Sequence, residues 1–133
     1  MSADRDLVAA MRTAALADAS VQALIGARFY DEPPPDAVFP YVTLARVENR
    51  AVDSSDVEAI EHAVTLHAWS RYGGRAEALD IIGALREALH DAPLTVTGRR
   101  LVLLFAQFAD VFRSGDGQTT HAVLRLRALT ELE

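Results

Sequence analysis

The chain has 133 residues, enough for one domain and too few for two ordinary ones, so we expect a single domain over residues 1–133. Half of the residues are hydrophobic and none is cysteine, which allows a sizeable core but excludes thiol catalysis, disulfide staples and cysteine-based zinc sites. The net charge is −6 and all 13 basic residues are arginine. This acidic balance disfavours stable binding of DNA or RNA, although not the transient passage of DNA past the surface.

The N-terminus is mixed in charge and lacks the apolar region of a signal peptide. The longest uninterrupted apolar run, residues 101–106, is far shorter than the roughly 20 residues of a membrane helix. We therefore predict no signal peptide, no membrane-spanning segment and no membrane partner.

Two helices are predicted at the start of the chain. Residues 3–17 place Leu7 and Met11 on one helical face, with charged residues opposite. A shorter helix over residues 20–25 has Ser20 as a plausible N-cap and a glycine directly after its end.

A loop and two strands follow. Residues 31–36 contain three consecutive prolines, which remove backbone donors and predict an extended loop. Residues 41–52 and 63–71 alternate in polarity and predict two strands. In the second strand, His67 and Trp69 share one face and the aliphatic residues share the other.

The second half of the chain is predicted to form one helix followed by strands. Residues 75–90 have apolar residues at helical spacing, including Leu79, and predict a helix that ends before a proline. Residues 94–97 predict a short strand. Residues 100–112 and 119–129 predict a hairpin around a turn containing two glycines.

Strands joined by hairpins favour an antiparallel sheet, and the helices then pack on it. The predicted fold class is α+β, with an antiparallel sheet of about four to five strands in the order α-(α)-β-β-α-(β)-β-β.

Histidines offer the first candidates for chemistry. His62 and His67 lie five positions apart on one strand, so they face opposite sides and cannot chelate a metal together. His90 ends a helix, and His121 lies on the last strand. Because the usual ligand spacings are missing, we predict no metal site.

Carboxylates gather at Asp53, Asp56, Glu58 and Glu61. The segment lacks the spacing of a calcium loop. An acid–base pair, a solvated hairpin loop and an acidic rim on an assembled particle are the remaining interpretations.

Two further motifs are weak. Gly73-Gly74-Arg75 opens a helix but matches no phosphate-binding pattern, so a plain strand-to-helix turn competes with a phosphate site. The serines that could act as nucleophiles, Ser54, Ser55, Ser70 and Ser114, lie in no nucleophile elbow. We predict no catalytic residue, no cofactor and no enzyme.

Strand faces supply the stronger signal. Residues 100–112 are apolar on both faces, with Phe105 expected on one face and Phe108 on the other. Either helices or other strands cover both faces, or a neighbouring subunit covers the second one. We name Trp69, Phe108, Arg125 and Arg127 as interface candidates; Asp53, Asp56, Glu58 and Glu61 are candidates for an interface or a lumen.

Five segments together resemble a known family. They are residues 61–71 (EHAVTLHAWSR), 73–78 (GGRAEA), 40–44 (PYVTL), 89–94 (LHDAPL) and 121–129 (HAVLRLRAL). As a set they resemble the tail terminators of long-tailed phages and gene-transfer agents, also called tail-completion or tail-to-head joining proteins.

The resemblance implies a structural virion protein that forms a hexameric ring in the tail at the head–tail junction, after assembly in the host cytoplasm. The ring would cap the tail tube protein, end tail polymerisation and offer a surface to a head-completion or connector protein, with DNA passing through its lumen. The family has no catalytic motif to transfer. The alternatives are an assembly chaperone or scaffolding module of the same fold and an enzyme acting on a phosphate ligand.

Overall fold

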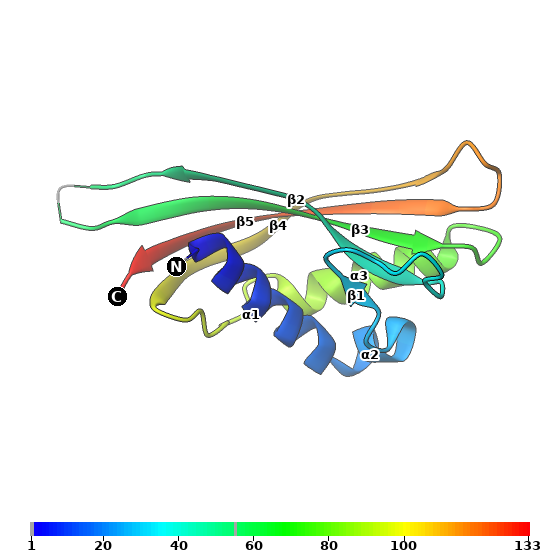
Figure 1. Cartoon of the computed structure of the whole chain (residues 1–133), viewed down its shortest axis with the longest axis horizontal. Helices are drawn as coiled ribbons and strands as arrows, with labels where there is room; N and C mark the ends of the chain where they lie inside the picture. The colour runs from blue at the N-terminus through cyan, green and yellow to red at the C-terminus, as the bar shows by residue number, and fades with distance from the viewer. Residues whose placement is uncertain (1, 55) are drawn as a thin grey trace.

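In the computed structural model, which describes residues 2–54 and 56–133, helices pack on one face of a five-stranded sheet (Figure 1). The elements are α1 (Ala3–Ala17), α2 (Ala19–Ile25), β1 (Phe29–Tyr30), β2 (Tyr41–Ala51), β3 (Ala59–Ser70), α3 (Ala76–Leu89), β4 (Arg99–Arg113) and β5 (Thr120–Leu132). The predicted α+β class is confirmed.

The N-terminal helices begin at side-chain caps. The Ser2 hydroxyl accepts a hydrogen bond from the backbone N–H of Arg5 at 3.1 Å and opens α1. Asp18 caps α2 by accepting from the backbone N–H groups of Ser20 and Val21, each at 3.0 Å. The predicted cap at Ser20 is therefore wrong, because an aspartate two residues earlier reaches both free donors.

The sheet order is β1-β2-β3-β5-β4, and one pairing differs from the prediction. β1 pairs in parallel with β2, so the sheet is mixed rather than purely antiparallel. Its two residues are too few to show a period, so no pattern in the sequence indicated this strand. The strand predicted at residues 94–97 is also wrong, since this segment makes only an isolated bridge between Val96 and Arg99.

The core lies between the sheet and the helices. Leu66, Leu124 and Leu126 point from the sheet toward Leu7 and Leu85 of the helices, and all five side chains are buried. Burying each such leucine contributes about 1.5–3 kcal/mol. The predicted stripe of α3 is confirmed except at its edge, where Leu79 is 54% exposed.

Bulges interrupt the alternation of two strands. The register shifts between Leu44 and Arg46 in β2, and in β4 it shifts between Leu101 and Leu103 and again between Ala106 and Phe108. Each shift inserts one extra residue and reverses the faces that follow. The expected alternation is therefore wrong beyond the bulge in β2, whereas in β4 the first bulge reverses the faces and the second reverses them back.

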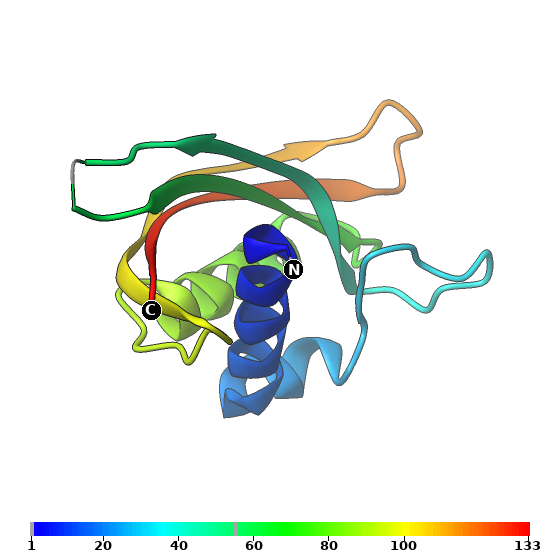
Figure 2. The ribbon, with the colours of Figure 1, turned by 60° about the vertical axis from the view of Figure 1, so that its left-hand side comes forward.

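Both hairpins of the sheet extend past the helices (Figure 1). The turned view shows the sheet curving over the helices, with its opposite face uncovered along its length (Figure 2). No single helix among the described residues is long and apolar enough to cross a membrane; α1 and α2 qualify by length and composition only as a pair, bent by 86°.

Candidate assembly surface

We call the uncovered side of the sheet the outer face. In an antiparallel pair, opposed residues point to the same side, so the register defines rows across the sheet. The row nearest the β4–β5 turn contains Tyr41, Trp69, His121 and Phe112. Toward the other end, the side chains from β2 and β5 become increasingly charged.

A bulge in β4 gathers the three phenylalanines of this strand on the outer face. Phe105 opposes Arg127, Phe108 opposes Arg125, and Phe112 opposes His121. All three rings are about two-fifths exposed. The predicted separation of Phe105 from Phe108 is wrong because Gln107 is the extra residue between them; this polar residue inside an apolar run was the one available sign.

A strand that is apolar on both faces can be covered by helices or strands of its own subunit, or by a neighbouring subunit. The first explanation does not hold for β4. β4 is an edge strand, and the helices lie on the opposite side of the sheet (Figure 2). Several exposed aromatic side chains along one strand are typical of a surface that meets another protein.

An aromatic stack forms the end row. The Trp69 and His121 rings lie 3.9 Å apart between centroids at 18°, and the Phe112 ring lies 4.8 Å from His121. The Trp69 indole N–H donates to the Thr43 hydroxyl at 3.1 Å. These contacts hold Trp69 rigid, as a preorganised interaction surface requires.

Two histidines in this stack are shifted toward neutrality. Burial lowers the pKa of His67, and burial together with the nearby His67 charge lowers the pKa of His121. The Nε2 of His121 is buried without a hydrogen-bond partner among the described residues. The two rings lie 4.4 Å apart between centroids.

Ion pairs dominate the other end of the outer face. Glu61 lies between Arg127 at 2.7 Å and Arg50 at 3.1 Å. The hydrogen bond from Arg127 is the main cause that lowers the pKa of Glu61. The two arginines therefore compensate the charge of Glu61. Glu61 differs in this from Asp53, Asp56 and Glu58, the other acids that were predicted with it.

Arg125 is placed differently from Arg127. Its guanidinium lies 4.7 Å from the centre of the Phe108 ring, a cation–π contact. No carboxylate lies within ion-pair distance of Arg125 in the described part of the chain. Its charge is therefore available to a partner.

The remaining acidic candidates lie at the tip of the β2–β3 hairpin. Asp53, Asp56 and Glu58 are exposed, and Asp53 accepts a hydrogen bond from the backbone N–H of Ala59 at 2.9 Å. The tip extends beyond the helices (Figure 1). Ser55 lies outside the described residues.

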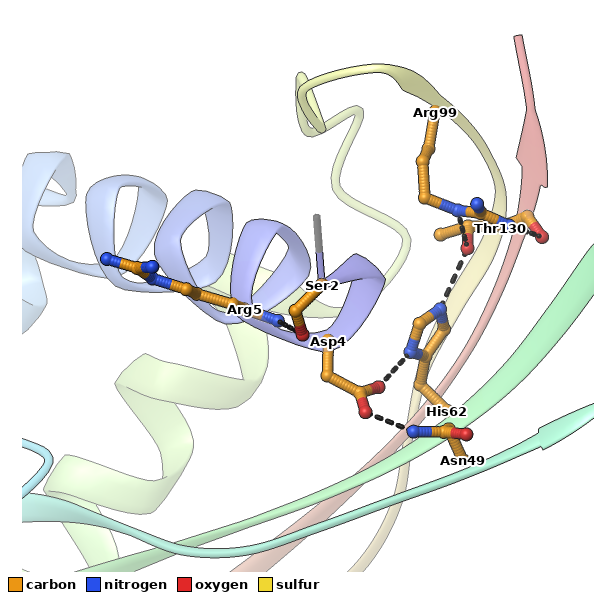
Figure 3. Close-up of polar contacts among 7 residues, drawn as sticks. All are labelled: Ser2, Asp4, Arg5, Asn49, His62, Arg99 and Thr130. Atoms are coloured by element: carbon orange, nitrogen blue, oxygen red, sulfur yellow. Dashed lines mark hydrogen bonds and ion pairs between the residues drawn. The ribbon is translucent and has the colours of Figure 1, made fainter.

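A buried polar chain was not found from the sequence. His62 contacts an Asp4 oxygen through Nδ1 at 2.6 Å and the Thr130 hydroxyl through Nε2 at 2.8 Å (Figure 3). The same hydroxyl accepts from Arg99 Nε at 2.8 Å, and Asn49 donates to the second Asp4 oxygen. No short-range pattern links residues 58 positions apart, so the sequence carried no signal for it.

Asp4, His62 and Thr130 follow one another as the acid, the base and the hydroxyl of a catalytic triad do. Unlike a catalytic hydroxyl, however, the Thr130 hydroxyl is not accessible. Thr130 and His62 are fully buried, so no substrate can reach the hydroxyl. With Asp4 accepting from His62, every donor has an acceptor, as a buried polar group requires. The chain of bonds fixes the start of α1 to β3 and β5, while His67 lies on the outer face, as predicted from the spacing.

The weaker chemical candidates form no site. Arg75 precedes α3 without a side-chain cap, and Glu77 places a negative charge in the first turn, where a phosphate would bind. Ser70 is buried and donates to Glu77 at 2.7 Å. No cluster of three or more metal-binding side chains occurs within residues 2–54 and 56–133.

The fold and its surfaces define a class: a one-sided α+β subunit whose prominent features are a rigid aromatic sheet face and projecting hairpins. The family described as tail completion protein gp17 matches residues 9–131. The chain belongs to this family, and it is therefore a structural tail protein of a virion or virus-like particle rather than an enzyme.

Individual relatives agree. The tail completion protein gp17 of Bacillus phage SPP1 is 29% identical over 99 residues, which cover 73% of this chain and 72% of that protein. A chain in the virion of a native gene transfer agent particle superposes with a TM-score of 0.90 at 27% identity, covering 98% of both chains. The solved structure of bacteriophage SPP1 gp17 gives a TM-score of 0.63 at 27% identity, covering 95% and 89%.

Proposed function

We propose that the protein assembles into a hexameric ring that caps the tail tube, ends its polymerisation and presents the head side with a docking surface through which DNA passes. One observation carries the proposal: an aromatic outer face that no helix or strand covers in the described part of the chain. Membership of a tail-completion family supplies the setting.

The mechanism is steric and templated. The ring binds the last layer of tail tube protein, blocks further addition and offers a different surface to the head-completion or connector protein. Trp69, Phe108 and Arg125 belong to the contacts between subunits, and Arg127 acts through the Arg50–Glu61–Arg127 cluster that shapes the same face.

The acidic hairpin tip is assigned to the lumen. Three exposed carboxylates, Asp53, Asp56 and Glu58, repel the phosphate backbone and keep DNA moving through the ring. The fold places them beyond the helices, where a ring can expose them to its channel without disturbing the core (Figure 1).

Electron microscopy of the purified chain at high concentration, alone and with tail tubes, tests this function. We expect closed rings and tubes capped at one end. Phe108→Asp should abolish the rings, because it removes the aromatic side chain from the contact and places a carboxylate beside Arg125, whose charge is then no longer available to a partner. Leu79→Asp is the matched control, since Leu79 is also exposed but lies on α3; it should leave rings intact.

Persistently monomeric protein and uncapped tubes would refute the proposal. Mass spectrometry of finished particles separates the ring from an assembly chaperone, because only a ring subunit remains in the particle. Thermal stabilisation by nucleotides or inorganic phosphate would instead favour a phosphate-binding enzyme.

A further inference from the structure

The loop between β1 and β2 is built to project. Three consecutive prolines, residues 33–35, fix φ and hold the residues before them extended, so the segment keeps a polyproline-like form without a partner. A turn closes it where the Ala37 N–H donates to the Pro34 carbonyl at 3.0 Å. The loop protrudes from the body on the β1 side of the sheet (Figure 2).

The chemistry of the loop is unusual for an inert connection. Asp31, Glu32 and Asp36 are exposed, and none makes an ion pair within the described residues. Val38 is 64% exposed in the same loop. The segment therefore presents prolines, an aliphatic side chain and uncompensated negative charge together.

The opposite lateral edge of the sheet carries the complementary groups. Along β4, Phe108 and Phe112 are exposed on the outer face, and Arg125 covers the Phe108 ring. Aromatic surfaces are the usual partners of proline-rich extended segments, and arginine pairs with carboxylates. Asp110 lies between the two phenylalanines on the same face, opposes Val123 and makes no ion pair with Arg125 within the described residues.

The loop and this strip lie at the same level of the sheet. Tyr41 directly follows the loop, and the register places Tyr41, Trp69, His121 and Phe112 in one row across the strands. The loop therefore stands at one end of the row and Phe112 at the other. With the sheet between them, they cannot meet within one subunit.

We propose that residues 33–36 of one copy dock on the Phe108–Phe112 strip of the next copy, with Asp36 of the loop pairing with Arg125. The inference rests on the proposed ring. Two different surfaces at one level on opposite edges make a head-to-tail contact, and repeating such a contact by rotation closes a ring.

Disulfide trapping tests the contact cleanly because the chain has no cysteine of its own. Pro35→Cys and Phe112→Cys chains are prepared separately, then mixed and oxidised. We expect little disulfide dimer from either variant alone and, because an equal mixture places the two cysteines at adjacent positions by chance, about half of the chains as dimer from the mixture. A chain carrying both substitutions should give a covalent ladder that ends at the ring's subunit number.

Asp80→Cys mixed with Phe112→Cys is the control for random collision, because Asp80 is exposed on α3. This pair should remain monomeric. A second test needs no cysteine: Asp36→Arg and Arg125→Glu should each weaken association about tenfold, and mixing the two variants should recover most of it.

The outcomes separate this inference from the proposed function. Rings in the microscope without the Pro35–Phe112 cross-link and without charge rescue would overturn the contact and leave the ring standing. Neither rings nor cross-links, even with tail tubes present, would overturn both. Equal cross-linking by each single variant alone would indicate a symmetric dimer and also reject the head-to-tail contact.

Discussion

The two faces of the sheet differ in chemistry although the same strands supply both. On β5, Leu124 and Leu126 are fully buried in the core between the sheet and the helices, whereas Val123 and Arg125 point to the outer face. An antiparallel sheet with one solvated face normally has polar residues there. The outer face instead carries an aromatic strip, and we propose that folding satisfies one face and assembly the other.

The largest expected effect uses two neighbours on β5. Leu124→Ala should lower the free energy of unfolding by about 2–5 kcal/mol, because it opens a cavity in the core. Val123→Ala should cost less than about 1 kcal/mol in the monomer, because its side chain is only partly buried. Urea unfolding of the two variants measures both values, and equal losses would contradict the division between the faces.

The next effect concerns two threonines on opposite faces. Thr130→Val removes the hydroxyl shared by His62 and Arg99, and leaving buried polar groups unpaired costs about 1–3 kcal/mol. Thr65→Val on the outer face should change stability by less than about 0.5 kcal/mol. A neutral Thr130→Val would show that the buried chain of bonds does not fix α1 to the sheet.

Acid should lower the free energy of unfolding through two histidines on the outer face. The pKa values of His67 and His121 lie below the ordinary 6.5, so the unfolded chain takes up these protons first. This contribution to stability is fully present above about pH 6.5 and is lost as the pH falls below it. Calorimetry from pH 8 to 5 should show the decline, and replacing both histidines by glutamine should flatten it; an unchanged slope would assign the decline to other groups.

The smallest effect on stability is expected at the hairpin tip. Asp56→Arg with Glu58→Arg should change the free energy of unfolding by less than about 0.5 kcal/mol, since both side chains are exposed. Asp53→Asn completes the set and keeps the oxygen that accepts from Ala59. The triple variant should fold and assemble but impair DNA passage; particles that eject DNA normally would refute the lumen assignment.

Much of the fold could be predicted from local signals. The period of α1, the prolines of the β1–β2 loop and the alternation of β3 and β5 each indicated their element within a few residues. β1 could not be predicted, since a two-residue strand exists only because β2 lies beside it. The interface candidates Trp69, Phe108 and Arg125 were found individually, and they stay predictions for the contacts between subunits.

The sequence by itself determined the class of fold, the family and the lack of a recognisable catalytic motif. These follow from periodicity and short motifs, which depend only on residues close together in the chain. Only the tertiary structure decided which side chains share a face. The bulge at Gln107 in β4 brought Phe105 to the face of Phe108 and Phe112, and long-range contacts joined Asp4 to His62 and His62 to Thr130. Register and distant hydrogen bonds depend on strand pairing, which no local pattern encodes.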